Sequence, residues 1–176
     1  HLDILNLKKI NANFDIVEVM GVLHHMENPI EGWKVLTDCL KPGGLMKIGL
    51  YSELARQNLI HVKKLVDQMG FGSSKSEIRS FRNSVTQLIE ENFENISTWG
   101  DFFSLSELRD LVFHVQEHRF NLLQIHSLLA ELGLQFCGFE DPRLIENFKL
   151  KNEGREDPFD LIKWHKHEEN NPNTFT

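Results

Sequence analysis

The sequence predicts an α/β fold, and three features of residues 14–52 lead to that prediction. Phe14–Met20 is an apolar, β-branched run of strand length, and Leu45–Leu50 is a second such run. Between them, apolar residues recur at helical spacing from Pro29, which suits the first position of a helix, to Leu40. Two strands joined by a helix form a βαβ unit, so we expect parallel strands and a right-handed crossover.

Two turns complete this unit. Gly21 ends the first strand and begins a loop that runs to Glu27. Pro42-Gly43-Gly44 follows the helix, and this combination predicts a helix stop and a sharp reversal before the second strand.

The motifs of this block resemble those of a known enzyme family. FDIVEV at 14–19, VLHH at 22–25 and LKPGG at 40–44 together resemble the fourth-strand, helix and fifth-strand block of class I S-adenosylmethionine-dependent methyltransferases, type 11/12-like. The runs FHVQEHRF at 113–120 and LGLQFCGFE at 132–140 are similar to the subgroup often attached to tetratricopeptide repeats. The alternative is another doubly wound α/β domain.

The resemblance implies a partial Rossmann-like sheet that contains strands four, five and six of the family, the last at Leu134–Glu140. It divides the chain into a core, residues 1–51 and 121–150, a helical lid insertion, residues 52–120, and a carboxy-terminal helix and tail, residues 151–176. The sequence has no initiator methionine and no glycine-rich G-x-G-x-x-G loop. We therefore expect the carboxy-terminal part of a methyltransferase domain, a truncated domain whose parent chain could carry an upstream repeat domain.

The resemblance also implies a cofactor, S-adenosylmethionine, and residues that border it. Asp3 and Ile4 hold the places of the family's adenine-binding pair, and Met20, Gly21 and Val22 follow the fourth strand. The alternative for Asp3 is a solvated loop acid. Because the glycine loop and the ribose-binding acid are missing, we expect this chain alone to bind the cofactor weakly or not at all and to be inactive by itself.

His24 and His25 lie in the loop after the first predicted strand. In open α/β sheets, ligands bind beyond the carboxyl ends of the strands, and this loop is at such an end. Imidazole titrates near neutral pH, so either histidine could act as a general base in methyl transfer to an unidentified acceptor. Alternatively, one histidine faces solvent and the other packs against the loop.

The predicted lid consists of helical patterns at 54–69, 76–91 and 104–115, the last opened by the capping box Ser104–Glu107. Its basic residues could meet an anionic substrate or could be the solvated faces of surface helices. They are Arg56, Arg79, Arg82 and Arg109.

His114-Val-Gln-Glu117-His118 matches the H-x-x-E-H pattern of inverted zinc peptidases, which places two histidines on one helix face. A catalytic zinc would need a third ligand, and Glu140, Asp141 and Glu146 are weak candidates. The preferred interpretation is a substrate-side polar cluster at the foot of the lid, without a metal, formed by His114, Glu117, His118 and Arg119. A purely structural role, in which they tie the lid to the core by hydrogen bonds, has similar weight. A zinc hydrolase and a non-catalytic binding or assembly domain remain the alternative functions.

Beyond the lid, the sequence predicts a helix at 121–132 capped by Asn121, the strand at 134–140, and helices at 142–150 and 158–168. Cys39 and Cys137 lie within apolar patterns and are interpreted as buried free thiols in a reducing, cytoplasmic compartment.

The composition limits the partners. A net charge of −7 argues against nonspecific binding to nucleic acid or to anionic membranes, and no apolar run approaches the ~20 residues that span a bilayer. The predicted strands would each have a bare edge, and both are apolar on both faces. We therefore expect a homodimer through the exposed edge of the sheet.

Overall fold

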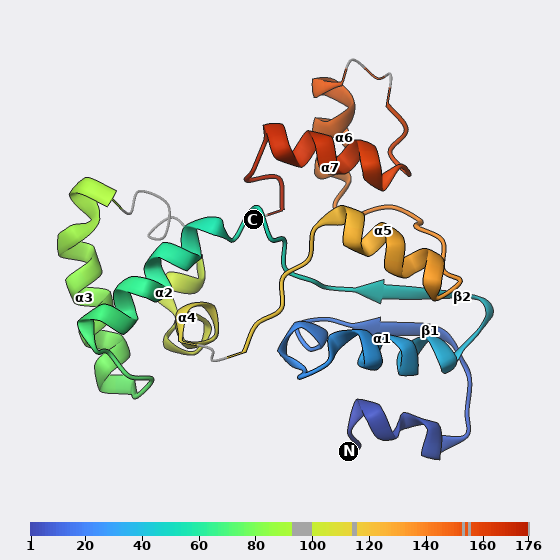
Figure 1. Cartoon of the computed structure of the whole chain (residues 1–176), viewed down its shortest axis with the longest axis horizontal. Coiled ribbons are helices and arrows are strands. Elements are labelled where there is room, and N and C mark those ends of the chain that lie inside the picture. The colour runs from blue at the N-terminus through green and yellow to red at the C-terminus, as the bar shows by residue number, and fades with distance from the viewer. Residues whose placement is uncertain (93–99, 114–115, 153, 155, 176) are drawn as a thin grey trace. The chain divides into compact units, whose positions relative to one another are not determined.

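The computed structural model describes residues 1–92, 100–113, 116–152, 154 and 156–175. The chain divides into two compact units, each described here by itself (Figure 1). Unit 1 contains residues 1–55 and 116–176, and unit 2 contains residues 56–115. The predicted insertion at 52–120 is therefore slightly longer than unit 2, and the segment that follows residue 115 belongs with the sheet.

The predicted βαβ unit is present, and its strands are parallel. Strand β1, Phe14–Val19, pairs with β2, Leu40–Ile48, and α1, Pro29–Asp38, connects them (Figure 1). The carbonyl oxygen of the Asn28 side chain accepts a hydrogen bond from the Glu31 amide at 3.2 Å and so caps α1, one position before the proline.

The Pro-Gly-Gly sequence was predicted to form a turn before the second strand. In the structure it lies inside that strand. Phe14 pairs with Leu40 whereas Ile16 pairs with Leu45, so β2 contains extra residues between these two pairs. Gly43 has a φ of +76°, and a Cβ on Gly44 would come within 2.9 Å of the Asp15 carbonyl oxygen. Two adjacent glycines thus allow β2 to bulge against β1 and to continue in register.

The two faces of this sheet differ in burial. Val17, Val19 and Ile48 belong to a core that also contains Trp33 and Leu36 of α1. The paired residues Ile16 and Leu45 project from the other side, because side chains alternate along a strand, and they are 68% and 60% exposed. One face of the sheet is therefore covered and the other is open, although the strands carry apolar side chains on both faces.

The predicted third strand at Leu134–Glu140 is not formed; residues 134–139 have neither helix nor strand structure. The sheet of the described residues has two strands. Side chains, rather than backbone pairing, hold this segment: Phe136 and Phe139 pack in an aromatic core, and Glu140 accepts a hydrogen bond from Lys47 at 2.8 Å. Alternating hydrophobicity is not sufficient for a strand when no strand lies beside it.

The last three helices of unit 1 build that aromatic core. They are α5, Leu122–Glu131, α6, Pro142–Lys151, and α7, Leu161–Asn170. Trp164 of α7 stacks on Phe148 of α6 with ring centroids 4.0 Å apart, and both side chains are fully buried. Asn121 caps α5 in a reciprocal capping box with Gln124, as the sequence predicted for this cap.

Unit 2 is helical in its described part. It contains α2, Gln57–Met69, α3, Lys75–Asn92, the short 3-10 helix η4, Gly100–Phe103, and α4, Leu105–Val112. Their buried apolar side chains form one cluster around Phe81 and Leu108. Gly70 ends α2 with a φ of +70°, and Ser104 caps α4 as its capping sequence predicted.

Three smaller features complete the fold. Residues Ile4–Ile10 form the 3-10 helix η1, which the sequence analysis did not predict. Cys39 is buried as predicted, but Cys137 is exposed, because the segment that carries it is not a sheet strand. Within the described ranges, none of the helices combines the length and the apolar character that crossing a membrane requires.

Candidate functional site

Three aromatic rings meet where the parallel strands end. His24 and His25 lie in the 3-10 helix η2, Leu23–His25, after β1, and Tyr51 follows β2. The ring centroids of His24 and Tyr51 are 3.9 Å apart, and those of His24 and His25 are 4.2 Å apart. Both segments follow the carboxyl ends of their strands, so parallel pairing brings them to one edge of the sheet.

Residues 116–120 contact the site although they are far from it in the sequence. The His118 amide donates to the His24 carbonyl oxygen at 2.8 Å, and the Phe120 amide donates to the Tyr51 carbonyl oxygen at 2.9 Å. The Gln116 side-chain amide also donates to the Met26 carbonyl oxygen at 3.2 Å. Backbone contacts therefore join the two predicted parts of the site, the loop after β1 and the HVQEH segment.

The contact of His25 determines which of its nitrogens is basic. Its Nδ1 lies 3.2 Å from the Gln116 carbonyl oxygen. A carbonyl oxygen only accepts, so the neutral ring donates through Nδ1–H and keeps the lone pair on Nε2. His25 is half-buried, whereas the His24 side chain is only 1% exposed. Of the two predicted bases, His25 is therefore the one with the better access to a ligand, and His24 is packed as in the structural alternative.

Glu117 and His118 follow in the adjoining segment. The Glu117 side chain is 3% exposed, and its carboxylate lies 3.9 Å from Nε of Arg119. His118 is half-buried, and its Nε2 is a buried atom for which the described residues offer no hydrogen-bond partner. His114, the remaining predicted residue of this group, lies outside the described residues.

The zinc alternative depends on His114, which lies outside the described residues. Residues 116–119 are not helical, so Glu117 and His118 lack the helix that the H-x-x-E-H pattern requires. No group of three or more histidine, cysteine, aspartate or glutamate side chains that could hold a metal occurs among the described residues.

The predicted cofactor-binding residues lie at two places in unit 1. Asp3 caps η1 through Oδ1, which accepts from the Leu5 amide at 2.8 Å, and Ile4 is half-buried against the core. Met20 and Val22 are exposed apolar side chains at the end of β1, 50% and 40% exposed, and Gly21 between them has a φ of +70°.

A buried carboxylate from α7 contacts Ser52, the residue after Tyr51. Glu168 is 1% exposed and accepts a hydrogen bond from the Ser52 hydroxyl. Burial raises the pKa of Glu168, an effect partly offset by the Ser52 hydrogen bond and by His165. The Ser52 oxygen also accepts a hydrogen bond from the Ala55 amide at 3.1 Å. The Ser52 hydroxyl therefore links α7 to the segment that follows β2.

Tyr51 and Glu168 were not among the residues predicted for the site. Tyr51 is the single tyrosine of the chain, and its place after the second parallel strand was a usable signal. Glu168 had no such signal, because its partner Ser52 is far away in the sequence.

Two of the lid arginines have structural contacts in unit 2. A guanidinium nitrogen of Arg82 donates to the Phe103 carbonyl oxygen at 3.2 Å, and one of Arg109 donates to the Ser73 carbonyl oxygen at 2.8 Å. These contacts join the helices of unit 2 to its loops.

Comparison with known proteins finds distant sequence similarity but no family. No family model matches the chain. The chain is 24% identical over 152 residues to "Uncharacterized protein syc1184_c" of Synechococcus sp., and the match covers 80% of this chain and 35% of that protein. The chain thus spans about a third of the length of the curated relative that it matches.

Proposed function

We propose that this chain is the acceptor side of an S-adenosylmethionine-dependent methyltransferase domain and that His25 is its general base. One observation supports the proposal most strongly: His24, His25, Tyr51 and residues 116–120 gather at the carboxyl ends of two parallel strands. Ligands of open α/β sheets bind at this edge. The sequence motifs of the βαβ block add the resemblance to the family.

The residues present suit only part of the cofactor. Asp3, Ile4, Met20, Gly21 and Val22 offer an acceptor and apolar surface for an adenine ring, whereas the sequence has no glycine-rich loop for the remainder. When bound, S-adenosylmethionine supplies a methyl group on a positively charged sulfur.

The chain's own contribution concerns the methyl acceptor. A nucleophilic oxygen or nitrogen that gains a methyl group must lose a proton, and Nε2 of His25 is a basic nitrogen that can take it. His24 and Tyr51 pack around His25 and fix its ring, and the Gln116 carbonyl oxygen fixes its tautomer. Glu117 and His118 lie in the adjoining segment and are proposed to border the acceptor.

Titration calorimetry of this chain with S-adenosylmethionine tests the cofactor part. Each missing hydrogen bond to a charged or buried group is worth about 1.5–3 kcal/mol, so the loss of several moves the dissociation constant to about millimolar. Replacing Met20 by Asn is expected to weaken this binding further, and Met69→Asn, on an exposed methionine of unit 2, is the matched control. Micromolar affinity of the chain alone would contradict the expectation.

A second candidate, an assembly domain, is supported by the open face of the sheet. Ile16 and Leu45 are paired neighbours and largely exposed, and each strand has one partner among the described residues. A second copy of the chain that packs on this face would cover Ile16 and Leu45, and one that extends the sheet would pair a bare edge.

Light scattering at tens of micromolar tests this candidate. The proposal predicts a dimer that Ile16→Asn and Leu45→Asn convert to a monomer, while Ile30→Asn on the exposed side of α1 leaves it intact. A wild-type monomer at this concentration would exclude assembly through this face.

A further inference from the structure

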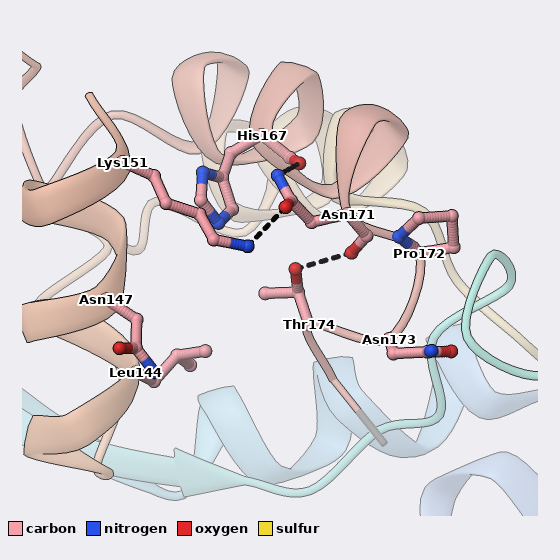
Figure 2. A pocket seen from close by; sticks show the side chains of 8 residues that line it. All are labelled: Leu144, Asn147, Lys151, His167, Asn171, Pro172, Asn173 and Thr174. Carbon is pink, nitrogen blue, oxygen red and sulfur yellow. Dashed lines mark hydrogen bonds between the residues drawn. The ribbon is translucent and has the colours of Figure 1, made fainter.

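A pocket of about 420 Å³ lies between α6, α7 and the segment that follows α7 (Figure 2). Its lining is polar with two apolar side chains: Leu144, Asn147, Lys151, His167, Asn171, Pro172, Asn173 and Thr174. None of these residues is acidic, although the chain as a whole has a net charge of −7. An anion that enters this pocket therefore meets a cation and amides, with no carboxylate in the wall.

Lys151 supplies the positive charge, and a hydrogen-bond network holds it. Its ammonium group donates to the side-chain oxygen of Asn171, whose own amide nitrogen donates to the His167 carbonyl oxygen at 2.8 Å. The Thr174 hydroxyl donates to the Asn171 carbonyl oxygen at 2.6 Å. Lys151 makes no ion pair with any residue that the structure describes, and an ammonium group has three donors, so it retains donors for a ligand.

His167 is held as a neutral donor. It is 7% exposed, and its Nδ1 lies 3.2 Å from the side-chain nitrogen of Asn152. That nitrogen also donates to the Phe148 carbonyl oxygen at 2.7 Å, which identifies it as the amide nitrogen. Nδ1 therefore accepts, and the ring proton is on Nε2. Burial, and next the charge of Lys151, lower the pKa of His167, which favours this neutral form.

The positive character continues into an adjoining hollow of about 190 Å³. This hollow shares Lys151, His167 and Asn171 with the pocket and adds Lys163 and Lys166. Its acidic residue, Glu156, is already paired with Lys163 at 3.1 Å. A phosphate group in the pocket would thus lie in a region where positive charge exceeds negative charge.

We propose that the α6–α7 pocket binds a small molecule that carries a phosphate group. Lysine ammonium groups bind phosphate as point charges, and a phosphate offers more acceptor oxygens to the surrounding donors than a carboxylate does. Figure 2 shows Asn147 and Lys151 on α6, one helical turn apart, across the pocket from Thr174. Leu144 and Pro172 provide apolar surface for the organic part of the ligand.

Calorimetry of the whole chain at constant ionic strength tests the proposal with inorganic phosphate and glycerol 3-phosphate as probes. Both are expected to bind, glycerol 3-phosphate more tightly, whereas acetate and glycerol are not. Lys151→Gln is expected to raise the dissociation constant about tenfold or more, because a charge-assisted contact is lost. Lys34→Gln, on an exposed lysine of α1 in the same unit, is the matched control.

Thermal melting of both variants separates binding from folding, and Lys151 is exposed, so its replacement is expected to leave the fold intact. The proposal is overturned if neither phosphate probe binds, if acetate binds as tightly as phosphate, or if Lys151→Gln and Lys34→Gln have the same effect. Thr174→Val is a second, milder variant and is expected to weaken glycerol 3-phosphate binding severalfold. Unchanged binding would mean that the Thr174 hydroxyl does not contribute to the site.

Discussion

Two regions of unit 1 each contain a histidine whose tautomer is set by one neighbour. They are the strand-end site, which consists of His24, His25, Tyr51 and residues 116–120, and the α6–α7 pocket. The two neighbours act in opposite ways. The Gln116 carbonyl oxygen makes Nδ1 of His25 a donor, which leaves Nε2 as a base. The Asn152 amide makes Nδ1 of His167 an acceptor, which leaves Nε2–H as a donor. One residue type thus suits proton transfer in one region and anion binding in the other, and the difference comes from a single hydrogen-bond partner.

The two regions also differ in their support. The rings of His24, His25 and Tyr51 pack on one another at the edge of a small sheet, and backbone hydrogen bonds from residues 116–120 hold them. The pocket rests on a fully buried aromatic pair, Phe148 and Trp164. Substitutions in the aromatic core should therefore disrupt the pocket, whereas substitutions of its own rings should disrupt the strand-end site.

The largest effect is expected from Trp164→Ala. The side chain is 0% exposed, stacks on Phe148, and donates through Nε1 to the Pro158 carbonyl oxygen at 2.9 Å. Removal should lower the free energy of unfolding by about 3–5 kcal/mol, measured by urea denaturation. Phe159→Ala, on an aromatic side chain that is 59% exposed, is the control and should cost less than about 1 kcal/mol. Equal losses would mean that the aromatic stack does not support α6 and α7.

A smaller effect is expected from His24→Ala, and it separates the two histidines of the loop. His24 is buried between His25 and Tyr51, so its removal leaves a cavity and should cost about 2 kcal/mol in urea unfolding. His25→Ala should cost less than about 1 kcal/mol, since the ring is half-buried. The reverse order would assign the structural role to His25 and would argue against His25 as the base.

The smallest effect is expected from Glu168, which follows His167 on α7, and it concerns how the free energy of unfolding varies with pH. Burial raises the pKa of Glu168 above its ordinary value of 4.5, so the folded state holds this proton more tightly than the unfolded state. The resulting stability is fully present below pH 4.5 and is lost as the pH rises through the raised pKa. Glu168→Gln keeps a neutral side chain at every pH. The free energy of unfolding of the variant, relative to that of the wild type, should therefore increase as the pH rises.

Urea unfolding between pH 4 and 8 measures this difference. Glu169→Gln is the control, because the Glu169 side chain is 58% exposed, and it should not change the pH dependence. If Glu168→Gln and the wild type have parallel profiles, the pKa of Glu168 is the same in the folded and unfolded states, which would contradict the raised pKa.

The sequence predicted those elements whose signals are local. Asn121 and Ser104 cap the helices that follow them, and Pro29 begins α1, because caps depend on a few adjacent residues. The parallel pairing of β1 and β2 was also predictable, since a helix connects the strands.

Non-local features were not predictable in this way. Residues 134–140 have the alternation of a strand, but a strand also needs a neighbour to pair with, and alternation does not supply one. The bulge at Gly43-Gly44 depends on the close approach of the Asp15 carbonyl, which is a tertiary contact. At the site, His24 and His25 followed from their place after a strand, whereas Glu168 and the tautomers of His25 and His167 depend on partners far away in the sequence.

The most direct test of the account is amide NMR of the isotope-labelled chain titrated in turn with S-adenosylmethionine and with inorganic phosphate. We expect two separate sets of shifted resonances: residues 3–4 and 20–25 with S-adenosylmethionine at millimolar concentrations, and residues 144–151 and 167–174 with phosphate. His25→Gln should leave the first set in place, since His25 is proposed to act on the acceptor. No shift at residues 20–25 with several millimolar S-adenosylmethionine, or shifts at the phosphate set alone with both ligands, would contradict the proposed methyltransferase site.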